Sequence, residues 1–184
     1  KNYNRLLEIA RGQYFKWAAH DDNILPEFLN QCIHALQDDP GLVLSYPSTR
    51  VIDGAGKLIR NYRDGLDLQQ ALPHERLLSY LRLNFMRERG LCNPIFGVLR
   101  TAELKKTRLI QDFLSSDRLL LAHLALVGRF RELPEYLFER RVHPNISTLA
   151  DSSFKARRAW FDASPSSSCG RSIYLDNYLS LRIT

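Results

Sequence analysis

The fold is decided by residues 2–29, whose sequence is NYNRLLEIARGQYFKWAAHDDNILPEFL. Apolar residues at helical spacing predict a helix over 4–11, and an aromatic-rich segment over 13–19 predicts a short buried strand. A polar turn occupies 20–23, and Pro26 starts a second helix, since proline is well tolerated in a first helical turn. This order of helix, strand and helix is typical of the α/β class.

Alternating helix and strand signals continue outward from this stretch. Apolar runs predict strands at 42–46, 93–99, 130–134 and 136–142. Periodic apolar residues predict helices at 73–85, 101–106 and 117–127, the last of them largely buried. A Gly-Ala-Gly turn at 54–56 predicts a hairpin. We therefore expect an α/β fold with a mixed, mainly parallel sheet flanked by helices over residues 1–150, followed by a C-terminal helix and flexible tail over 151–184.

The composition is that of an ordinary globular domain with an excess of positive charge. The 184 residues, 45% of them hydrophobic, are enough for one substantial core. No apolar run approaches the roughly 20 residues that a membrane span requires, and no secretory signal pattern occurs, so we expect a cytoplasmic protein. Three cysteines without a CxxC pair argue against zinc ribbons. The net charge of +6 favours phosphate-bearing partners, but the basic residues are scattered and no RNA- or DNA-binding motif occurs, so nucleic acid is not expected.

Four stretches of the chain together resemble the family-2 nucleotide-sugar glycosyltransferases of the A-type fold. Residues 2–29 match that family's order of helix, ARG-x-Y, strand, acidic turn and a helix opening PEFL. The similarity continues in NPIFG at 93–97, SDR at 116–118 and YLFERRVHP at 136–144. The resemblance implies a Rossmann-like domain that transfers a sugar with inversion of configuration and depends on a divalent cation, Mg²⁺ or Mn²⁺.

Asp21 and Asp22 occupy the position of that family's metal-binding acidic turn. Two adjacent carboxylates after a strand lie where open α/β sheets bind ligands, and an ion held by one or two carboxylates leaves room for diphosphate oxygens. Ala19 stands where the family often has a further acid. His143 is similar to a family histidine that approaches the metal and the diphosphate. The alternatives are a helix cap at Asp22 or Asn23 and a surface turn at His143.

Asp117 follows Ser116 at the head of the apolar helix predicted over 117–127. Family members have an acidic pair here, and its aspartate is the general base that takes the proton of the acceptor hydroxyl. The resemblance therefore gives Asp117 the catalytic role and places Ser116 beside the substrate. A carboxylate suits this role if partial burial raises its pKa towards the working pH. The alternative is a helix cap formed by Ser115, Ser116 or Asp117.

Five further residues are expected to contact substrate. They are His20, Asn93, Gly97, Arg140 and Arg141. Gly97 would allow a close backbone approach, and guanidinium groups suit diphosphate oxygens. Adjacent strand residues face opposite sides, so at most one of the two arginines should point into the site. The alternatives are a core strand start for NPIFG, a solvated strand face for the arginines, and a simple hydrogen-bond partner of the acidic turn for His20.

The family's nucleotide-binding half would precede the residue equivalent to Asn2, so the chain resembles a glycosyltransferase truncated at its N-terminus. The resemblance implies a nucleotide-sugar donor and a glycan, lipid-linked or small-molecule acceptor. The Leu- and Arg-rich segment 73–89 suggests peripheral contact with the inner face of a membrane, with a solvated basic face as the alternative. A second hypothesis is a non-catalytic module that binds a glycan or a partner, favoured by Ala19 and Ser116 in place of acids.

Overall fold

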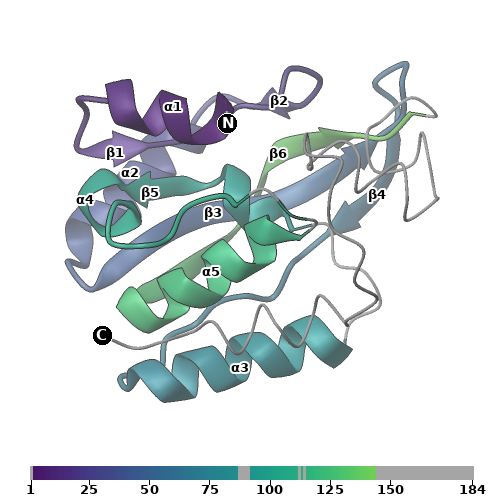
Figure 1. Cartoon of the computed structure of the whole chain (residues 1–184). Coiled ribbons are helices and arrows are strands. Elements are labelled where there is room, and N and C mark those ends of the chain that lie inside the picture. The colour runs from purple at the N-terminus through teal and green to yellow at the C-terminus, as the bar shows by residue number, and fades with distance from the viewer. Residues whose placement is uncertain (1, 87–91, 112, 114, 144–184) are drawn as a thin grey trace, which may run out of the picture.

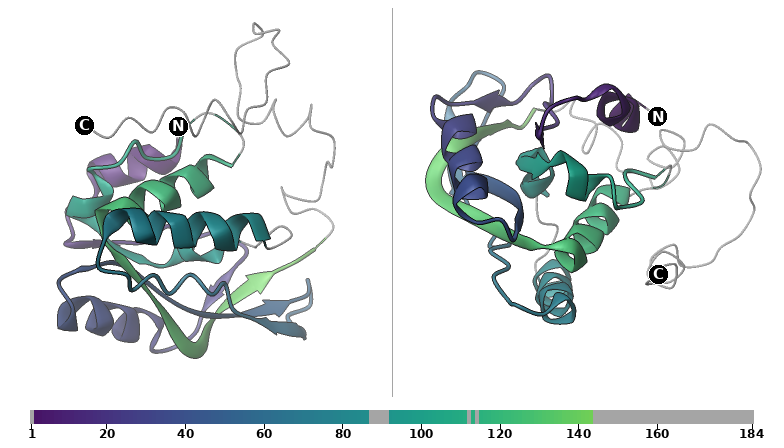
Figure 2. Two further views of the ribbon diagram at one scale, coloured as in Figure 1. Left: turned by 90° about the horizontal axis from the view of Figure 1, so that it is seen from below. Right: turned by 90° about the vertical axis from the view of Figure 1, so that its left-hand side faces the viewer.

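The computed structural model describes residues 2–86, 92–111, 113 and 115–143 (Figure 1). Its elements in chain order are α1 (Asn2–Ile9), β1 (Tyr14–Phe15), β2 (Asn23–Ile24), α2 (Phe28–Asp38), β3 (Leu42–Ile52), β4 (Leu58–Tyr62), α3 (Pro73–Met86), the 3-10 turn η1 (Asn93–Phe96), β5 (Val98–Arg100), α4 (Thr101–Leu104), α5 (Ser116–Val127) and β6 (Arg129–Arg141). The described strands form one sheet in the order β1-β5-β3-β6-β2, and β4 pairs with β3 outside this path. The expected α/β class with a mixed sheet flanked by helices is confirmed, and the sheet is curled (Figures 1 and 2).

Strand β3 is the centre of the sheet, and helices cover both of its faces. All but one of its eleven residues are buried, as a strand covered on both sides requires. Helix α2 packs on one face through three fully buried side chains, Phe28, Cys32 and Leu36. Helices α1, α3, α4 and α5 contribute to the larger core on the other face (Figure 2). Helix α5 is largely buried, as its apolar sequence predicted.

The sheet is not mainly parallel, and that expectation was wrong. Among the described strands, only β3 and β6 pair in parallel, while β3 with β4, β3 with β5, β1 with β5 and β2 with β6 are antiparallel. The connections explain this result. A tight turn, closed by a 2.9 Å hydrogen bond from Asp53 N–H to the Lys57 carbonyl, joins β3 to β4 and permits only an antiparallel pair. The parallel pair is joined by a long connection that contains α3, α4 and α5.

One edge of β3 is shared by two strands that leave a gap between them. Strand β5 pairs with residues 44–45 of β3, and β4 pairs with β3 from Thr49 onward. Pro47 falls in this gap, where its missing N–H removes no hydrogen bond to either strand.

Strand β6 is continuous, although the sequence predicted two strands at 130–134 and 136–142. It follows β3 along its whole length, and residues 134–135 bulge out of the ladder between the partners of Pro47 and Ser48. Such a bulge bends the strand without ending it, which is why a proline inside the run did not separate two strands.

The predicted strand at 93–99 forms only in its last part. Residues 93–96 make the 3-10 turn η1, because Pro94 lies in the first turn, where its fixed φ suits a helical start. Strand β5 then covers only residues 98–100. Asn93 consequently lies on a turn rather than in the ladder, and its side chain is directed to other elements.

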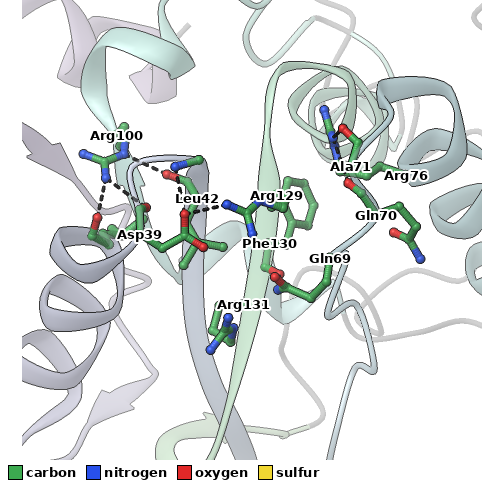
Figure 3. Close-up of polar contacts among 12 residues, drawn as sticks. Asp39, Leu42, Gln69, Gln70, Ala71, Arg76, Arg100, Arg129, Phe130 and Arg131 are labelled. Carbon is green, nitrogen blue, oxygen red and sulfur yellow. Dashed lines mark hydrogen bonds and ion pairs between the residues drawn. The ribbon is translucent and has the colours of Figure 1, made fainter.

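Three arginines join separate elements, Arg100 and Arg76 through backbone oxygens and Arg129 through a carboxylate (Figure 3). Arg100 donates to carbonyls at the end of α2 and the start of β3, among them that of Leu42 at 2.7 Å. Arg129, at the start of β6, lies 2.5 Å from Asp39 Oδ1. Arg76 of α3 is buried and donates to carbonyls at the end of α5 and in the loop before α3. Through these contacts Arg100 and Arg129 link the end of α2 to the sheet, and Arg76 links α3 to the end of α5.

Two further expectations concerned a membrane span and the C-terminal segment. No helix in the described part of the chain is long and apolar enough to cross a membrane. The C-terminal helix and flexible tail predicted over 151–184 lie outside the described residues.

Gly97, between η1 and β5, lies directly against β3. A Cβ atom at this position would lie 2.7 Å from the Ser45 carbonyl oxygen and 2.8 Å from both Leu44 Cδ1 and Tyr46 Cβ. We expect Gly97→Ala to lower the free energy of unfolding by about 2 kcal/mol in urea denaturation, because β5 must move away from β3. Gly54→Ala is the control, since its Cβ would meet only His143 Cβ at 3.7 Å. Equal stability of the two variants would show that β5 is not packed as described.

Candidate metal and substrate site

The acidic turn and the histidine meet at the carboxyl ends of β3 and β6. Asp21 Oδ2 lies 3.3 Å from His143 Nε2. Asp22 Oδ1 accepts a 3.0 Å hydrogen bond from the backbone N–H of Arg141. Strand β2, directly after the acidic turn, pairs with residues 138–139 of β6 and holds the turn against that strand. The carboxylates therefore lie at the end of the sheet where α/β folds bind ligands.

Asp21 and His143 fit a divalent cation as a pair of protein donors. A carboxylate and an imidazole are both ligands of divalent metals, and an ion with few protein ligands completes its coordination with water and phosphate oxygens. Across the described residues, no three His, Cys, Asp or Glu side chains gather closely enough to hold a metal ion by themselves. The fit is therefore to an ion shared with a phosphate-bearing ligand, and not to a closed structural site.

The helix-cap alternative for Asp22 and Asn23 is wrong. Helix α2 has Glu27 at its N-cap, with φ of 71° and no side-chain cap. Asn23 lies in β2, and its side chain donates to Glu139 at 3.3 Å. The Asp22 carboxylate therefore caps no helix and accepts a hydrogen bond from β6 instead.

Two cations, Arg140 and Lys16, lie near Asp22. Burial raises the pKa of Asp22, while the hydrogen bond from Arg141 and the charges of Arg140 and Lys16 lower it. The Lys16 ammonium lies 5.0 and 5.8 Å from the centroids of two buried phenylalanine rings, and burial lowers its pKa to about 8. Cations beside carboxylates are the combination that a diphosphate and its metal ion require.

Arg141 holds the acidic turn to the hairpin between β3 and β4. Its Nε donates to the Asp21 carbonyl at 3.0 Å, and its Nη1 donates to the carbonyls of Asp53 and Gly54, both at 3.1 Å. The guanidinium of Arg141 thus fixes the backbone around the site. The neighbouring guanidinium of Arg140 is directed to different groups.

Asn93 connects Arg140 to Thr49 of β3 and to Asp64. It is 2% exposed, and its Oδ1 accepts a 2.8 Å hydrogen bond from Arg140 Nη1. Its Nδ2 donates to Thr49 Oγ1 at 3.0 Å and to Asp64 Oδ2 at 3.1 Å. An amide that is satisfied on both ends in a buried place has a fixed orientation. The position of Arg140 therefore depends on groups that lie beneath it.

Two buried carboxylates, Asp64 and Glu132, were not predicted from the sequence. Both are buried, and Glu132 accepts the backbone N–H of Asp64 at 3.0 Å and of Gly65 at 2.8 Å. Burial raises the pKa of Asp64 to about 7, and the Glu132 charge adds to this rise against the hydrogen bonds from Asn93. Asp64 lies in the loop that follows β4, with no local pattern to mark it as buried. The one available sequence signal was Glu132, an acidic residue two positions after Phe130 and therefore on the same, buried face of β6.

Asp117 lies in the first turn of α5, and its carboxylate Oδ1 accepts the backbone N–H of Arg118 at 2.9 Å. Ser115 is the N-cap and makes no side-chain cap, while Ser116 is buried. Burial raises the pKa of the Cys92 thiol, just before η1, and the charge of the nearby Asp117 carboxylate raises it further. Asp117 therefore stabilises the helix start and also lies beside the turn that carries Asn93.

The remaining predicted residues lie at the two extremes of exposure. The side chain of His20 is 95% exposed, and its Nδ1 lies 3.7 Å from Asp21 Oδ1. Gly97 is buried against β3, so the close backbone approach at this glycine is to the sheet itself. Neither residue contacts the Asn93 and Arg140 hydrogen bonds described above.

No protein-family model matches the chain, and no curated protein matches it.

Proposed function

We propose that the chain is the metal- and acceptor-binding part of an inverting, nucleotide-sugar-dependent glycosyltransferase of the A-type fold. The contact between Asp21 and His143, 3.3 Å apart at the carboxyl ends of β3 and β6, is the observation that carries this proposal. Arg140 and Lys16 beside Asp22 support the binding of a diphosphate. The resemblance of the four sequence stretches supports the same family.

In the proposed reaction, an acceptor hydroxyl attacks the anomeric carbon of the donor from the face opposite the nucleoside diphosphate. The new C–O bond forms while the bond between the anomeric carbon and the diphosphate oxygen breaks, and that electron pair leaves with the diphosphate. Asp117 takes the proton of the hydroxyl. Attack from the opposite face inverts the configuration.

Each proposed role follows the position of the residue. Asp21 and His143 would hold the cation, which stabilises the charge that develops on the departing diphosphate. Arg140 would bind phosphate oxygens, a task that suits the planar guanidinium. Arg141 would keep the acidic turn in place through its three backbone carbonyls.

The test is metal-dependent binding of a nucleoside diphosphate. We expect the full-length gene product to bind at least one of UDP, GDP, CDP and dTDP in calorimetry with Mn²⁺, and to lose affinity about tenfold or more when Mn²⁺ is removed. The variant Asp21→Asn should show the same loss in the presence of Mn²⁺, because one of the two protein donors is weakened.

The exposed pair of Asp38 and His34 on α2 provides a matched control. Its atoms are 3.4 Å apart, close to the distance in the candidate site, but both side chains are about 70% exposed. Asp38→Asn should bind the diphosphate as the wild type does. Binding that is absent, or that is unaffected by both Mn²⁺ removal and Asp21→Asn, would count against the transferase.

A non-catalytic binding module remains the second candidate. The observation that favours it is Ala19 at the position of the family's further acid, together with only two metal donors in contact at the described site. Such a module would bind a glycan without Mn²⁺ and would release no nucleoside diphosphate from a donor. The calorimetric titration without metal, repeated with glycans, separates the two candidates.

A further inference from the structure

A buried polar cluster continues from the hydrogen bond between Arg140 and Asn93. It consists of Asp64, Asn93, Thr49 and Glu132, which are at most 6% exposed. Burying polar groups costs free energy unless each is hydrogen-bonded, so a cluster of this kind has a structural or functional reason. The proposed chemistry uses Arg140 but none of the carboxylates beneath it.

Glu132 and the backbone fix the place of Asp64. The two oxygens of Glu132 accept the backbone N–H groups of Asp64 and Gly65. The next N–H, of Leu66, donates to the Tyr46 hydroxyl at 3.0 Å. Three successive backbone groups of the loop after β4 are therefore held by side chains of β6 and β3, and the Asp64 carboxyl has a defined position.

The Asn93 amide links Asp64 to Arg140 through hydrogen bonds at its two ends. Its Nδ2 can reach Asp64 and Thr49 only while its Oδ1 faces Arg140, because the two ends of the amide point in opposite directions. Arg140 is in turn close enough to Asp22 for its charge to lower the pKa of that carboxyl. The contacts run from Asp64 through Asn93 and Arg140 to the acidic turn.

Charged and titratable groups face Asp64 from each neighbouring element. Glu132 and Arg140 face it from β6, Tyr46 from β3 and Cys92 from the residue before η1. Asp117 of α5 also acts on Cys92. Asp64 is thus joined to Arg140 through Asn93, and its charge acts on Cys92 as that of Asp117 does.

We propose that Asp64 is a positioning residue for the diphosphate of the donor: by orienting Asn93, it holds the Arg140 guanidinium beside the acidic turn. This inference rests on the proposed function, since the diphosphate is the ligand that Arg140 would contact. Asp64 itself touches no substrate atom in this scheme.

A double-mutant cycle tests the inference on the full-length gene product, with UDP or GDP and Mn²⁺ in calorimetry. Asp64→Leu removes the acceptor of the Asn93 amide and should weaken diphosphate binding about tenfold. Asp64→Asn retains an acceptor oxygen and should bind within about threefold of wild type. In an Arg140→Gln background, Asp64→Leu should change the affinity by less than about twofold, because the arginine that it positions is absent.

A ligand-free measurement tests the positioning by itself and does not require the Leu variant to fold. The Arg140 Nε–H signal, assigned by its absence in Arg140→Gln, should shift in a pH titration with a midpoint near 7, the pKa to which burial raises Asp64. The shift should be absent in Asp64→Asn, in which Glu132 and the other nearby groups still titrate. Asp67→Asn, which changes an exposed carboxylate of the same loop, should keep it.

The outcomes separate this inference from the proposed function. Wild-type protein that binds no nucleoside diphosphate overturns the function, and the inference with it. Wild-type binding together with unchanged binding in Asp64→Leu, or an equal loss in both arginine backgrounds, overturns the inference alone. An Arg140 signal that does not follow the titration of Asp64 also overturns the inference alone.

Discussion

The Asp117→Asn variant is expected to turn over a nucleotide-sugar donor at least about 10²-fold more slowly than wild type, because a positioned general base contributes roughly that factor or more. The amide cannot take the proton of the acceptor hydroxyl. It can still accept the Arg118 N–H that the carboxylate accepts at 2.9 Å, so the start of α5 should stay formed. The measurement is release of nucleoside diphosphate at saturating donor, across a panel of acceptors.

Two comparisons make this expectation specific to catalysis. Glu75 is the acidic residue in the first turn of α3, exposed and remote from the acidic turn in sequence, and Glu75→Gln should keep wild-type turnover. Asp117→Asn should also keep the wild-type affinity for nucleoside diphosphate with Mn²⁺, since Asp117 contacts neither Asp21 nor Arg140 in the hydrogen bonds described. Full turnover in Asp117→Asn would remove the catalytic role from this residue.

The sequence predicted helices and turns well where residues close together in the chain determine them. Helix α3 begins at Pro73 as predicted, and α5 differs from its prediction by one residue at the start. The turn at 54–56 joins two strands, as the hairpin pattern required. In each of these segments the deciding interactions are between residues a few positions apart.

Strand direction and continuity could not be obtained in this way. Whether β5 lies parallel or antiparallel to β3 depends on contacts between residues 98–99 and 44–45, which no local pattern records. Similarly, the run of β6 across residues 134–135 is maintained by pairing with β3 on both sides of the bulge. The mainly parallel sheet was inferred from alternation alone, and alternation does not fix the path of a connection.

Some residues of the candidate site were predicted from the sequence, and others depend on long-range contacts and were not. Asp21, Asp22 and His143 were predicted together through resemblance, and the structure brings the first and third within 3.3 Å. Asp64 and Glu132 escaped notice because their importance comes from burial beneath Arg140, a property of the assembled sheet. Residues that hold a site in place are harder to recognise than those that form it, since any acidic residue in a loop resembles a solvated one.

Arg76 is another charged residue whose burial the sequence did not reveal, and we expect it to stabilise the fold. It lies on α3 in a Leu- and Arg-rich segment that the sequence associated with a membrane or solvent surface, yet the side chain is only 5% exposed. Its Nε and Nη2 donate to the carbonyls of Ala125 and Leu126 at 2.7 and 3.1 Å, and Nη1 donates to those of Gln70 and Ala71. The charge therefore lies at the C-terminal end of α5, where the helix dipole favours a cation.

Replacing Arg76 by methionine should lower the free energy of unfolding by about 3 kcal/mol, because four carbonyls lose their donor while the packing volume is roughly kept. Arg76→Lys should fall between this variant and wild type, since one ammonium cannot span the same four oxygens. Arg82, further along α3 and exposed, is the control, and Arg82→Met should change stability by less than about 0.5 kcal/mol. Urea denaturation compares the three variants. If Arg76→Met and Arg82→Met proved equally stable, the carbonyls at the end of α5 would have to be satisfied by other groups, and α3 would not be held against α5 through this arginine.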